Sequence, residues 1–367
     1  MKSILSVGMD VHKNSFSLCA YDGYTGEIVS ESTFASDVKL VIKFIETLKS
    51  RYENDIEIKC GYEAGCLGYS LYKSLTARGV DCVILAPTTM QVSAKNKMVK
   101  NDRMDALNIA KNLASGSYKS VYAPDEEDVE IKEYIRMIHD FKKELKRVKQ
   151  EICAFVLRHG YQYDGKSKWT IRYMNWIREL EMSEIQRETL NEYIAEMENL
   201  NDKINRFMNR IDEMYQSERY HEKVSKLRCF KGIETFAAMT IQVETADFER
   251  FPSAKAYASY TGLTTGEHSS GDKNNRIGIT KQGNTVIRKT LVECAQSLVK
   301  GNVYAKKSQG LKSRQKGMDV NIIAYADKAT ERLKKKYQKL IERNVPRNKA
   351  IVAVARELAC FIWGMET

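Results

Sequence analysis

Several features common in other protein classes are scarce in this sequence. Its 367 residues include only 4 prolines, and none of its 8 cysteines lies in a CxxC pair. Neither a zinc site nor a disulfide framework is therefore indicated, and we expect reduced, mostly buried thiols. The sequence also lacks an apolar run of about 18 residues, the length of a membrane span, and a charged-then-apolar leader at its start. These absences predict a soluble, cytoplasmic protein with no membrane partner.

The remaining composition is typical of a folded chain with more than one module. Hydrophobic residues make up 43% of the sequence, too many for a disordered chain. Because one compact core usually serves roughly 100–200 residues, we expect two or three modules. We place them at residues 1–124, 125–225 and 226–367.

The positive charge of the chain is concentrated in the last of these segments. The formal net charge is +11, yet residues 226–367 carry 26 Lys and Arg against 13 Asp and Glu. The rest of the chain carries 33 basic and 35 acidic residues. A polyanion is the natural partner of such a segment, because Lys and Arg that neutralise phosphates release condensed counterions. The alternative is a solvated basic face that only maintains solubility.

The first 124 residues alternate between strand and helix patterns, in the order β-β-β-α-β-α-β-α. This order predicts an α/β fold in which helices pack on a mixed sheet, with the first three strands forming an antiparallel meander. The expected strands are Ser3–Asp10, Ser15–Tyr21, Glu27–Phe34, Ile56–Tyr62 and Cys82–Leu85, and the expected helices begin near Ser36, Leu67 and Asp102.

Residues 125–225 form a charged segment with apolar residues at helical spacing. They predict two long amphipathic helices that break near Tyr161–Ser167 and form an antiparallel pair or an oligomerising coiled coil. Residues 226–367 predict a mainly α-helical module in which short helices alternate with Gly-rich turns.

Four carboxylates stand at the ends of predicted elements. Asp10 closes the first strand and Glu63 the fourth, while Asp102 and Asp105 share one face at the start of a helix. Four anions in a small volume need compensation, which Mg²⁺ or Mn²⁺ ordinarily supplies. Taken singly, each acid reads as a solvent-facing residue or a helix cap. Together, their order and positions resemble the RNase H-like fold in its RuvC form, where such acids bind metal.

A second informative stretch surrounds two adjacent serines, Ser269 and Ser270. A serine hydroxyl can attack phosphorus when it is deprotonated or held in line, and nearby cations stabilise the charge that develops. A Ser-Ser-Gly sequence is also common in turns, so the residues alone do not separate a nucleophile from a turn. The cations expected to contact nucleic acid here are Lys273, Arg276, Lys281 and Arg288.

These motifs together resemble the DEDD insertion-sequence transposases of family one-ten, over essentially the whole chain. The resemblance rests on Gly8–Lys13, Tyr62–Gly65, Lys100–Ala106 and the stretch from Gly262 to Arg288. It implies a RuvC-like domain, a helical connector and a C-terminal transposase domain with an essential serine.

The resemblance also implies a recombinase that exchanges strands between donor and target DNA and is guided by a structured noncoding RNA, the bridge RNA. The metal-binding acids of the family would be Asp10, Glu63, Asp102 and Asp105, and its serine would be Ser269 or Ser270. The sequence departs from the family at Thr265, where proline is common. Three alternatives are a RuvC-like junction nuclease that uses water, an actin-like ATPase and a non-catalytic nucleic-acid-binding protein.

Tyrosines are interleaved with the basic residues of the C-terminal segment. Stacking on nucleic-acid bases is one interpretation of Tyr257, Tyr260 and Tyr304. Tyrosine is equally suited to a half-buried position in a helical core.

Overall fold

The protein is described by a computed structural model that covers residues 3–52, 56–65, 67–91, 101–267 and 276–367. The chain divides into two compact units, residues 1–124 and residues 125–367, and each is described by itself. Ser269, Ser270 and Lys273 lie outside the described residues. Within the described stretches, no helix is long and apolar enough to cross a membrane.

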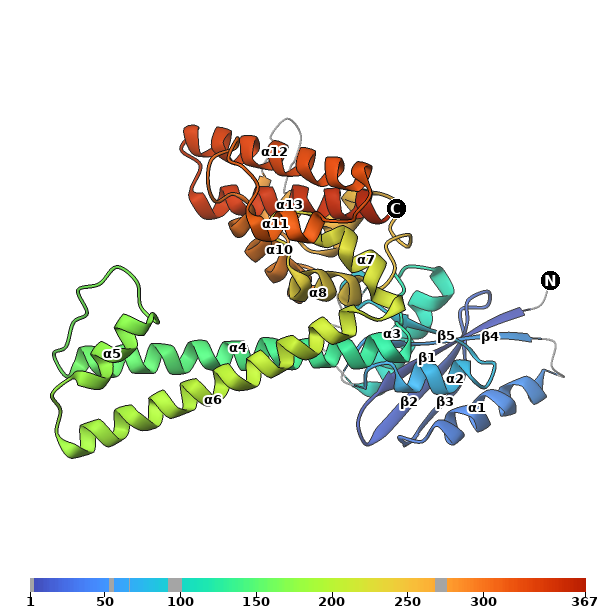
Figure 1. Cartoon of the computed structure of the whole chain (residues 1–367). Coiled ribbons are helices and arrows are strands. Elements are labelled where there is room, and N and C mark those ends of the chain that lie inside the picture. The colour runs from blue at the N-terminus through green and yellow to red at the C-terminus, as the bar shows by residue number, and fades with distance from the viewer. Residues whose placement is uncertain (1–2, 53–55, 66, 92–100, 268–275) are drawn as a thin grey trace. The chain divides into compact units, whose positions relative to one another are not determined.

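The first unit is built on a mixed sheet whose strands lie in the order β3-β2-β1-β4-β5 (Figure 1). The strands are β1 Ser3–Val11, β2 Ser15–Asp22, β3 Ile28–Ala35, β4 Ile56–Glu63 and β5 Asp81–Leu85. The first three form an antiparallel meander, whereas β4 and β5 run parallel to β1. The predicted mixed α/β sheet is confirmed, and its arrangement is consistent with an RNase H-like domain.

The two faces of this sheet carry different helices. Helices α1 (Val38–Arg51) and α2 (Ser70–Thr76) share a core with Leu5, Val7 and Met9 of β1. Helix α3 (Asp102–Ser115) lies against Gly8 of the same strand, and a short 3₁₀ turn, η1 (Pro87–Thr89), precedes it in the chain. Since side chains alternate along a strand, the odd-numbered positions of β1 face α1 and the even-numbered ones face α3.

The second unit begins with a long helical hairpin formed by α4 (Glu126–Arg158) and α6 (Glu184–Tyr215), with α5 (Ile171–Glu179) between them. The predicted break at 161–167 falls between α4 and α5. A capping box formed by Ser183 and Gln186 begins α6. Residues from the start of α4 share a core with residues from the end of α6, so the two helices are antiparallel.

The C-terminal helices pack on the base of this hairpin. They are α7 Glu218–Arg228, α8 Thr235–Thr245, α9 Ala254–Tyr260, α10 Thr285–Leu298, α11 Gln309–Gln315, α12 Val320–Glu342 and α13 Arg347–Glu366, with the short strands β6 Thr265–Glu267 and β7 Arg276–Ile279. Ile135 of α4, Leu291 of α10 and Leu358 of α13 belong to one core. The hairpin's other end has a separate core around Tyr173. The division of residues 125–367 at residue 225 stays a prediction.

Candidate active site

Asp10 and Glu63 stand at the ends of two neighbouring parallel strands. Gly8 of β1 lies opposite Gly61 of β4, and Met9 opposite Tyr62. Each acid follows its glycine by two residues, so both side chains leave the sheet on the face that carries α3. The pairing of β1 with β4 therefore brings Asp10 and Glu63, which belong to separate sequence motifs, to the same edge of the sheet.

Gly8 allows α3 to approach this face closely. A Cβ atom on Gly8 would lie 2.2 Å from the carbonyl oxygen of Ala106 and 2.3 Å from the amide nitrogen of Ala110. Both alanines are buried. A side chain at position 8 would therefore push the helix backbone away from the sheet, and the acids at the start of α3 would move with it.

Helix α3 begins in a way that suits an acidic first turn. Asn101 is the N-cap, and its side chain accepts a hydrogen bond from the amide of Met104 at 2.9 Å. Asp102 and Asp105 occupy the first turn, where the helix dipole favours negative charge. The same turn lies beside the end of β1, which brings Asp102 toward Asp10.

His12 joins the two aspartates, and sequence reasoning did not select it as a site residue. Its Nε2 lies 3.2 Å from Asp10 Oδ2 and 3.7 Å from Asp102 Oδ1. The ligand atoms of these three side chains all lie within 4.8 Å of one another. The sequence signal that identifies His12 as a candidate is its position two residues after Asp10, in the turn between the first two strands.

The carboxyl group of Asp10 is in an environment that disfavours its negative charge. Burial raises its pKa above the usual range, and the charges of Asp102 and Asp105 raise it further. The nearby His12 lowers the pKa but does not cancel these effects. A cation bound among these groups would compensate the repulsion.

The donor atoms fit a hard divalent cation. Carboxylate oxygens are the ligands that Mg²⁺ and Mn²⁺ prefer, and Asp10 and Asp102 supply two of them within one small volume. Among the described residues, Glu63 and Asp105 lie outside the group of three. Glu63 is exposed at the end of β4, whereas Asp105 is partly buried and close enough to raise the pKa of Asp10.

The segments on either side of the serine pair are held together by backbone contacts. Strand β6 pairs with β7, with Thr265 opposite Ile279 and Glu267 opposite Arg276. Gly283 has φ of 96°, and a Cβ there would lie 2.0 Å from the carbonyl oxygen of Tyr260. Glycine at this position of the motif therefore serves close backbone packing.

Two of the predicted nucleic-acid-binding cations have described side chains. Lys281 is exposed, with φ of 56°. Arg288 is partly buried, and its Nη1 donates a hydrogen bond to the carbonyl oxygen of Thr261 at 3.1 Å. The structure therefore gives Arg288 a role in holding the turn before β6.

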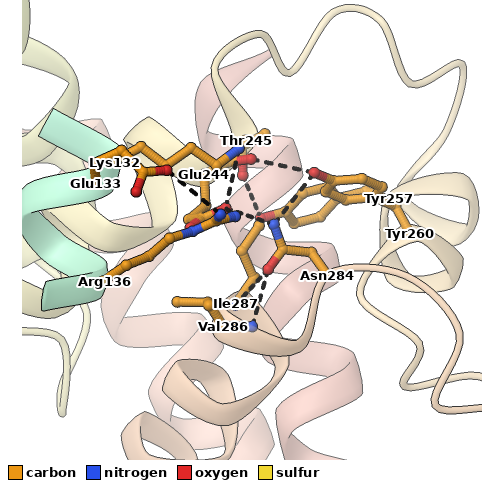
Figure 2. A network of polar contacts seen from close by, with 10 residues as sticks. All are labelled: Lys132, Glu133, Arg136, Glu244, Thr245, Tyr257, Tyr260, Asn284, Val286 and Ile287. Atoms are coloured by element: carbon orange, nitrogen blue, oxygen red, sulfur yellow. Dashed lines mark hydrogen bonds and ion pairs between the residues drawn. The ribbon is translucent and has the colours of Figure 1, made fainter. Parts of the chain in front are cut away.

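A buried carboxylate ties these segments to the long hairpin (Figure 2). The side chain of Glu244 is 0% exposed and contacts Lys132 Nζ at 3.2 Å and Arg136 Nε at 2.9 Å, both from α4. Asn284 donates to the same carboxylate at 2.7 Å, and Tyr260 donates to the backbone carbonyl of Glu244 at 3.2 Å.

Asn284 also caps α10. Its side-chain oxygen accepts hydrogen bonds from the amides of Val286 and Ile287, both at 3.0 Å (Figure 2). Tyr260 precedes the serine segment and Asn284 follows it. The Glu244 network therefore holds both ends of the stretch that contains Ser269 and Ser270.

The stacking interpretation of the tyrosines is wrong for Tyr257. Its side chain is fully buried, and its hydroxyl forms a hydrogen bond with Thr245 at 3.0 Å. Tyr260 packs in the same network, whereas Tyr304 is 79% exposed. Core packing accounts for Tyr257, because its ring lies 5.2 Å from the rings of Phe248 and Phe251 within the core of this unit.

Two stretches of the chain match known transposase families. Residues 7–160 match the DEDD transposase family of IS110, and residues 224–309 match the Transposase IS116/IS110/IS902 family. The chain is 30% identical to the transposase for insertion sequence element IS1533 of Leptospira borgpetersenii, covering 93% of this chain and 97% of that protein. The chain belongs to the IS116/IS110/IS902 family of transposases.

Other relatives extend the similarity over nearly the full length. The protein y4qE of Sinorhizobium fredii is 31% identical over 98% of this transposase and 87% of its own length. The transposase for insertion sequence element IS1111A of Coxiella burnetii is 23% identical, over 89% and 88% of the two chains.

The family identity establishes the enzyme class. Transposases bind DNA and act in DNA strand transfer, and those of the DEDD type are generally metal-dependent. The predicted family resemblance is thereby confirmed, and the actin-like ATPase and the non-catalytic binding protein are set aside. The four acids lie within the first matched stretch, and the serine pair lies within the second.

The repulsion at Asp10 predicts that a divalent metal ion stabilises the wild-type protein but not the Asp10→Asn variant. Mg²⁺ or Mn²⁺ should raise the melting temperature of the wild-type transposase, by the equivalent of about 2.7 kcal/mol at 100 times the dissociation constant. Asp10→Asn should be at least as stable as wild type without metal, because it removes a buried charge, and should lose the metal-dependent rise. Differential scanning calorimetry with and without metal measures both effects.

Glu57→Gln is the matched control for Asp10→Asn, because it also removes one carboxylate and lies exposed on β4. It should keep the metal-dependent rise. An equal rise in the Asp10→Asn protein would place the metal elsewhere.

The buried Glu244 network predicts a strong dependence of stability on one carboxylate. Glu244→Gln leaves Lys132 and Arg136 without their buried partner and should lower the free energy of unfolding by about 3–5 kcal/mol near pH 7. Burial raises the pKa of Glu244, but Arg136, Lys132 and Asn284 outweigh it, so the pKa lies below its usual range. Its contribution is therefore present above pH of about 4.3 and lost as the pH falls through the lowered pKa.

Urea unfolding at pH 7 and at acidic pH measures the free energy of unfolding of the wild-type and Glu244→Gln proteins, with Glu222→Gln as the control. Glu222 forms an exposed ion pair with Lys226 at 2.7 Å, so its removal should change stability little. A Glu244→Gln protein as stable as the control at pH 7 would contradict the role of the network.

Proposed function

We propose that this transposase cuts and rejoins DNA strands with a serine nucleophile, assisted by a divalent metal site. The observation that carries the proposal is the approach of α3 to β1, which groups Asp10, His12 and Asp102 within ligand distance of one another. Family membership adds the reaction class, DNA strand transfer.

The metal site would be formed by Asp10, Glu63, Asp102 and Asp105. Mg²⁺ is the proposed ion and Mn²⁺ the substitute, because oxygen donors predominate. When bound, such an ion polarises a phosphate and offsets the charge that develops on it. Asp10 is the central member, since it is the partly buried acid that the other aspartates repel.

The serine would carry the covalent step. The Oγ of Ser269 or Ser270 attacks a DNA phosphorus and loses its proton, while the bond from phosphorus to the 3′-oxygen breaks and that oxygen takes up a proton. The 3′-hydroxyl of another strand then attacks the serine phosphodiester, restores the DNA backbone and releases the serine. Lys273, Arg276, Lys281 and Arg288 are the proposed contacts to the phosphates.

Trapping the covalent intermediate tests the serine assignment. Wild-type protein incubated with donor and target DNA should give a protein–DNA band on a denaturing gel. Ser269→Ala with Ser270→Ala should abolish both the band and recombination, and the single variants identify the nucleophile. Ser308→Ala, which removes the side-chain cap of α11, is the control that should keep both. Adduct formation by the double variant, or metal-dependent cleavage without adduct, would favour a water nucleophile.

A basic surface on α12 supports nucleic-acid binding by the second unit. A hollow of about 660 Å³ there is lined by six cations and two acids, and these lining residues are Lys328, Glu331, Arg332, Lys335, Lys336, Lys339, Leu340, Arg343 and Glu357. Glu357 pairs with Arg332 and Lys336, both at 2.6 Å, which leaves a net positive stripe along the helix. Phosphates of DNA or RNA are suitable partners for it.

We also propose that a structured noncoding RNA selects the donor and target DNA by base pairing. The basic C-terminal segment and the family resemblance support this proposal. Base pairing between the RNA and the DNA would read the sequence, so the protein would not need to recognise the bases itself. Sequencing RNA that co-purifies with the transposase should recover one discrete transcript with segments complementary to both DNA sites. Recovery of only bulk cellular RNA would favour direct reading of DNA by the protein.

Self-association through the hairpin completes the proposal. Ile171 and Ile185, near the outer end of the hairpin, are 83% and 76% exposed. We propose that these side chains lie in a contact between copies of the chain, as a dimer or tetramer. The proposed setting is the cytoplasm, on the DNA that the enzyme rearranges.

A further inference from the structure

The outer end of the helical hairpin contains a groove that the strand-transfer chemistry does not use. The C-terminal half of α4, the connection to α5 and α5 itself surround about 810 Å³. Among the residues that the structure describes, the lining has four lysines, five aromatic residues and no carboxylate: Lys142, Leu145, Lys146, Lys149, Gln150, Cys153, Ala154, Val156, Leu157, Tyr161, Gln162, Tyr163, Lys168, Trp169, Tyr173 and Trp176.

The charges on α4 are segregated around this groove. Lys142, Lys146 and Lys149 recur at the spacing that places residues on one helical face. The acids of the same stretch lie on another face, where Arg147 binds Glu144 at 2.8 Å and Glu151 at 2.7 Å. The groove therefore keeps a net positive lining.

The aromatic rings form a connected cluster whose members are mostly accessible. Tyr163 and Trp176 have ring centroids 5.0 Å apart, and Trp169 and Tyr173 have theirs 5.2 Å apart. Tyr173 is buried, whereas Tyr163, Trp169 and Trp176 are partly exposed. The partly exposed rings therefore give the groove an aromatic surface that a ligand can reach.

Trp169 is held in an unusual position. Its φ is 66°, a left-handed backbone conformation that is rare for a bulky residue. Lys149 Nζ lies 5.3 Å from the centre of its ring. Strained residues persist where surrounding contacts hold them, and they concentrate at binding sites. With this backbone conformation, the indole ring of Trp169 lies beside the ammonium group of Lys149 at the groove.

We propose that this groove binds unpaired nucleotides of a single-stranded nucleic acid. The bases would stack on Trp169, Trp176 and Tyr163, and the phosphates would lie near Lys146, Lys149 and Lys168. Aromatic platforms beside lysines are the general means of holding single strands. A second copy of the groove is a poor occupant, because its lysines would face like charges.

Intrinsic fluorescence can test this site in the full-length protein. The chain has 3 tryptophans, and two of them line the groove. In a Trp363→Phe background, the tryptophan fluorescence, excited selectively over that of the tyrosines, comes from Trp169 and Trp176 alone. A ten-nucleotide oligo(U) or oligo(dT) should quench it, whereas a ten-base-pair duplex should quench it far less. Quenching by both single strands indicates recognition of base and phosphate, and quenching by oligo(U) alone indicates added contact with the 2′-hydroxyl.

Variants separate this groove from the basic surface on α12. Trp176→Leu should lower the affinity for the labelled single strand by about 5- to 150-fold, the loss of one stacked base. Lys146→Gln should weaken binding and its dependence on salt, and Lys143→Gln, an exposed lysine of α4 outside the groove, should not. The Lys146→Gln protein keeps the aromatic cluster, so it remains informative if Trp176→Leu fails to fold.

Three outcomes would overturn the proposal. The first is equal quenching by the duplex and by the single strands. The second is equal affinity of the Lys146→Gln and Lys143→Gln proteins for the single strand. The third is a change in the solution molecular mass of the Lys146→Gln protein without loss of its binding to the single strand. The last result would assign the groove to self-association. None of these outcomes bears on the serine or on the metal site.

Discussion

The close approach of α3 to β1 is the constraint on which the acidic site depends. It exists because position 8 has no side chain and because the facing residues of α3, Ala106 and Ala110, are small. With the helix seated there, its first turn lies beside the end of the strand, and Asp102 reaches the neighbourhood of Asp10. The repulsion that results is a cost in the free protein, and a cation bound at the proposed site would convert it into affinity.

The second unit depends on a comparable constraint of different chemistry. Glu244 is fully buried, and such a carboxylate is stable only when cations and hydrogen-bond donors surround it. Lys132 and Arg136 come from the hairpin, while Asn284 and Tyr260 come from the two sides of the serine segment. One charge therefore joins the long helices to the region that carries the proposed nucleophile, and Ile135 of the hairpin and Leu291 of α10 belong to one shared core.

The two ends of the hairpin belong to different cores. Its base belongs to the core of the C-terminal helices. Its outer end has its own small core, a groove with four lysines, and apolar residues such as Ile171 on the surface. An element with independent packing at its end can carry a binding site without disturbing the catalytic units, and we assign single-stranded nucleotides to that site.

The sequence by itself determined the order of the first unit's strands and helices, the long helices and the basic C-terminal segment. It also singled out four acids, of which the structure brings Asp10 and Asp102 together, whereas a metal site formed by all four stays a prediction. These properties depend on local periodicity, turn residues and composition, which act over a few neighbouring residues. The motif comparison also identified the family, because the motifs stand in a recognisable order along the chain.

Only the tertiary structure decided that His12 joins Asp10 and Asp102, that Arg288 holds the carbonyl of Thr261, and that Tyr257 is buried. It also decided that Glu244 meets Arg136, 108 residues away in the sequence. Such contacts arise when elements pack, and the spacing of residues along a chain carries no information about them. An isolated glutamate in an apolar helix reads as an exposed polar residue until the cations that surround it are known.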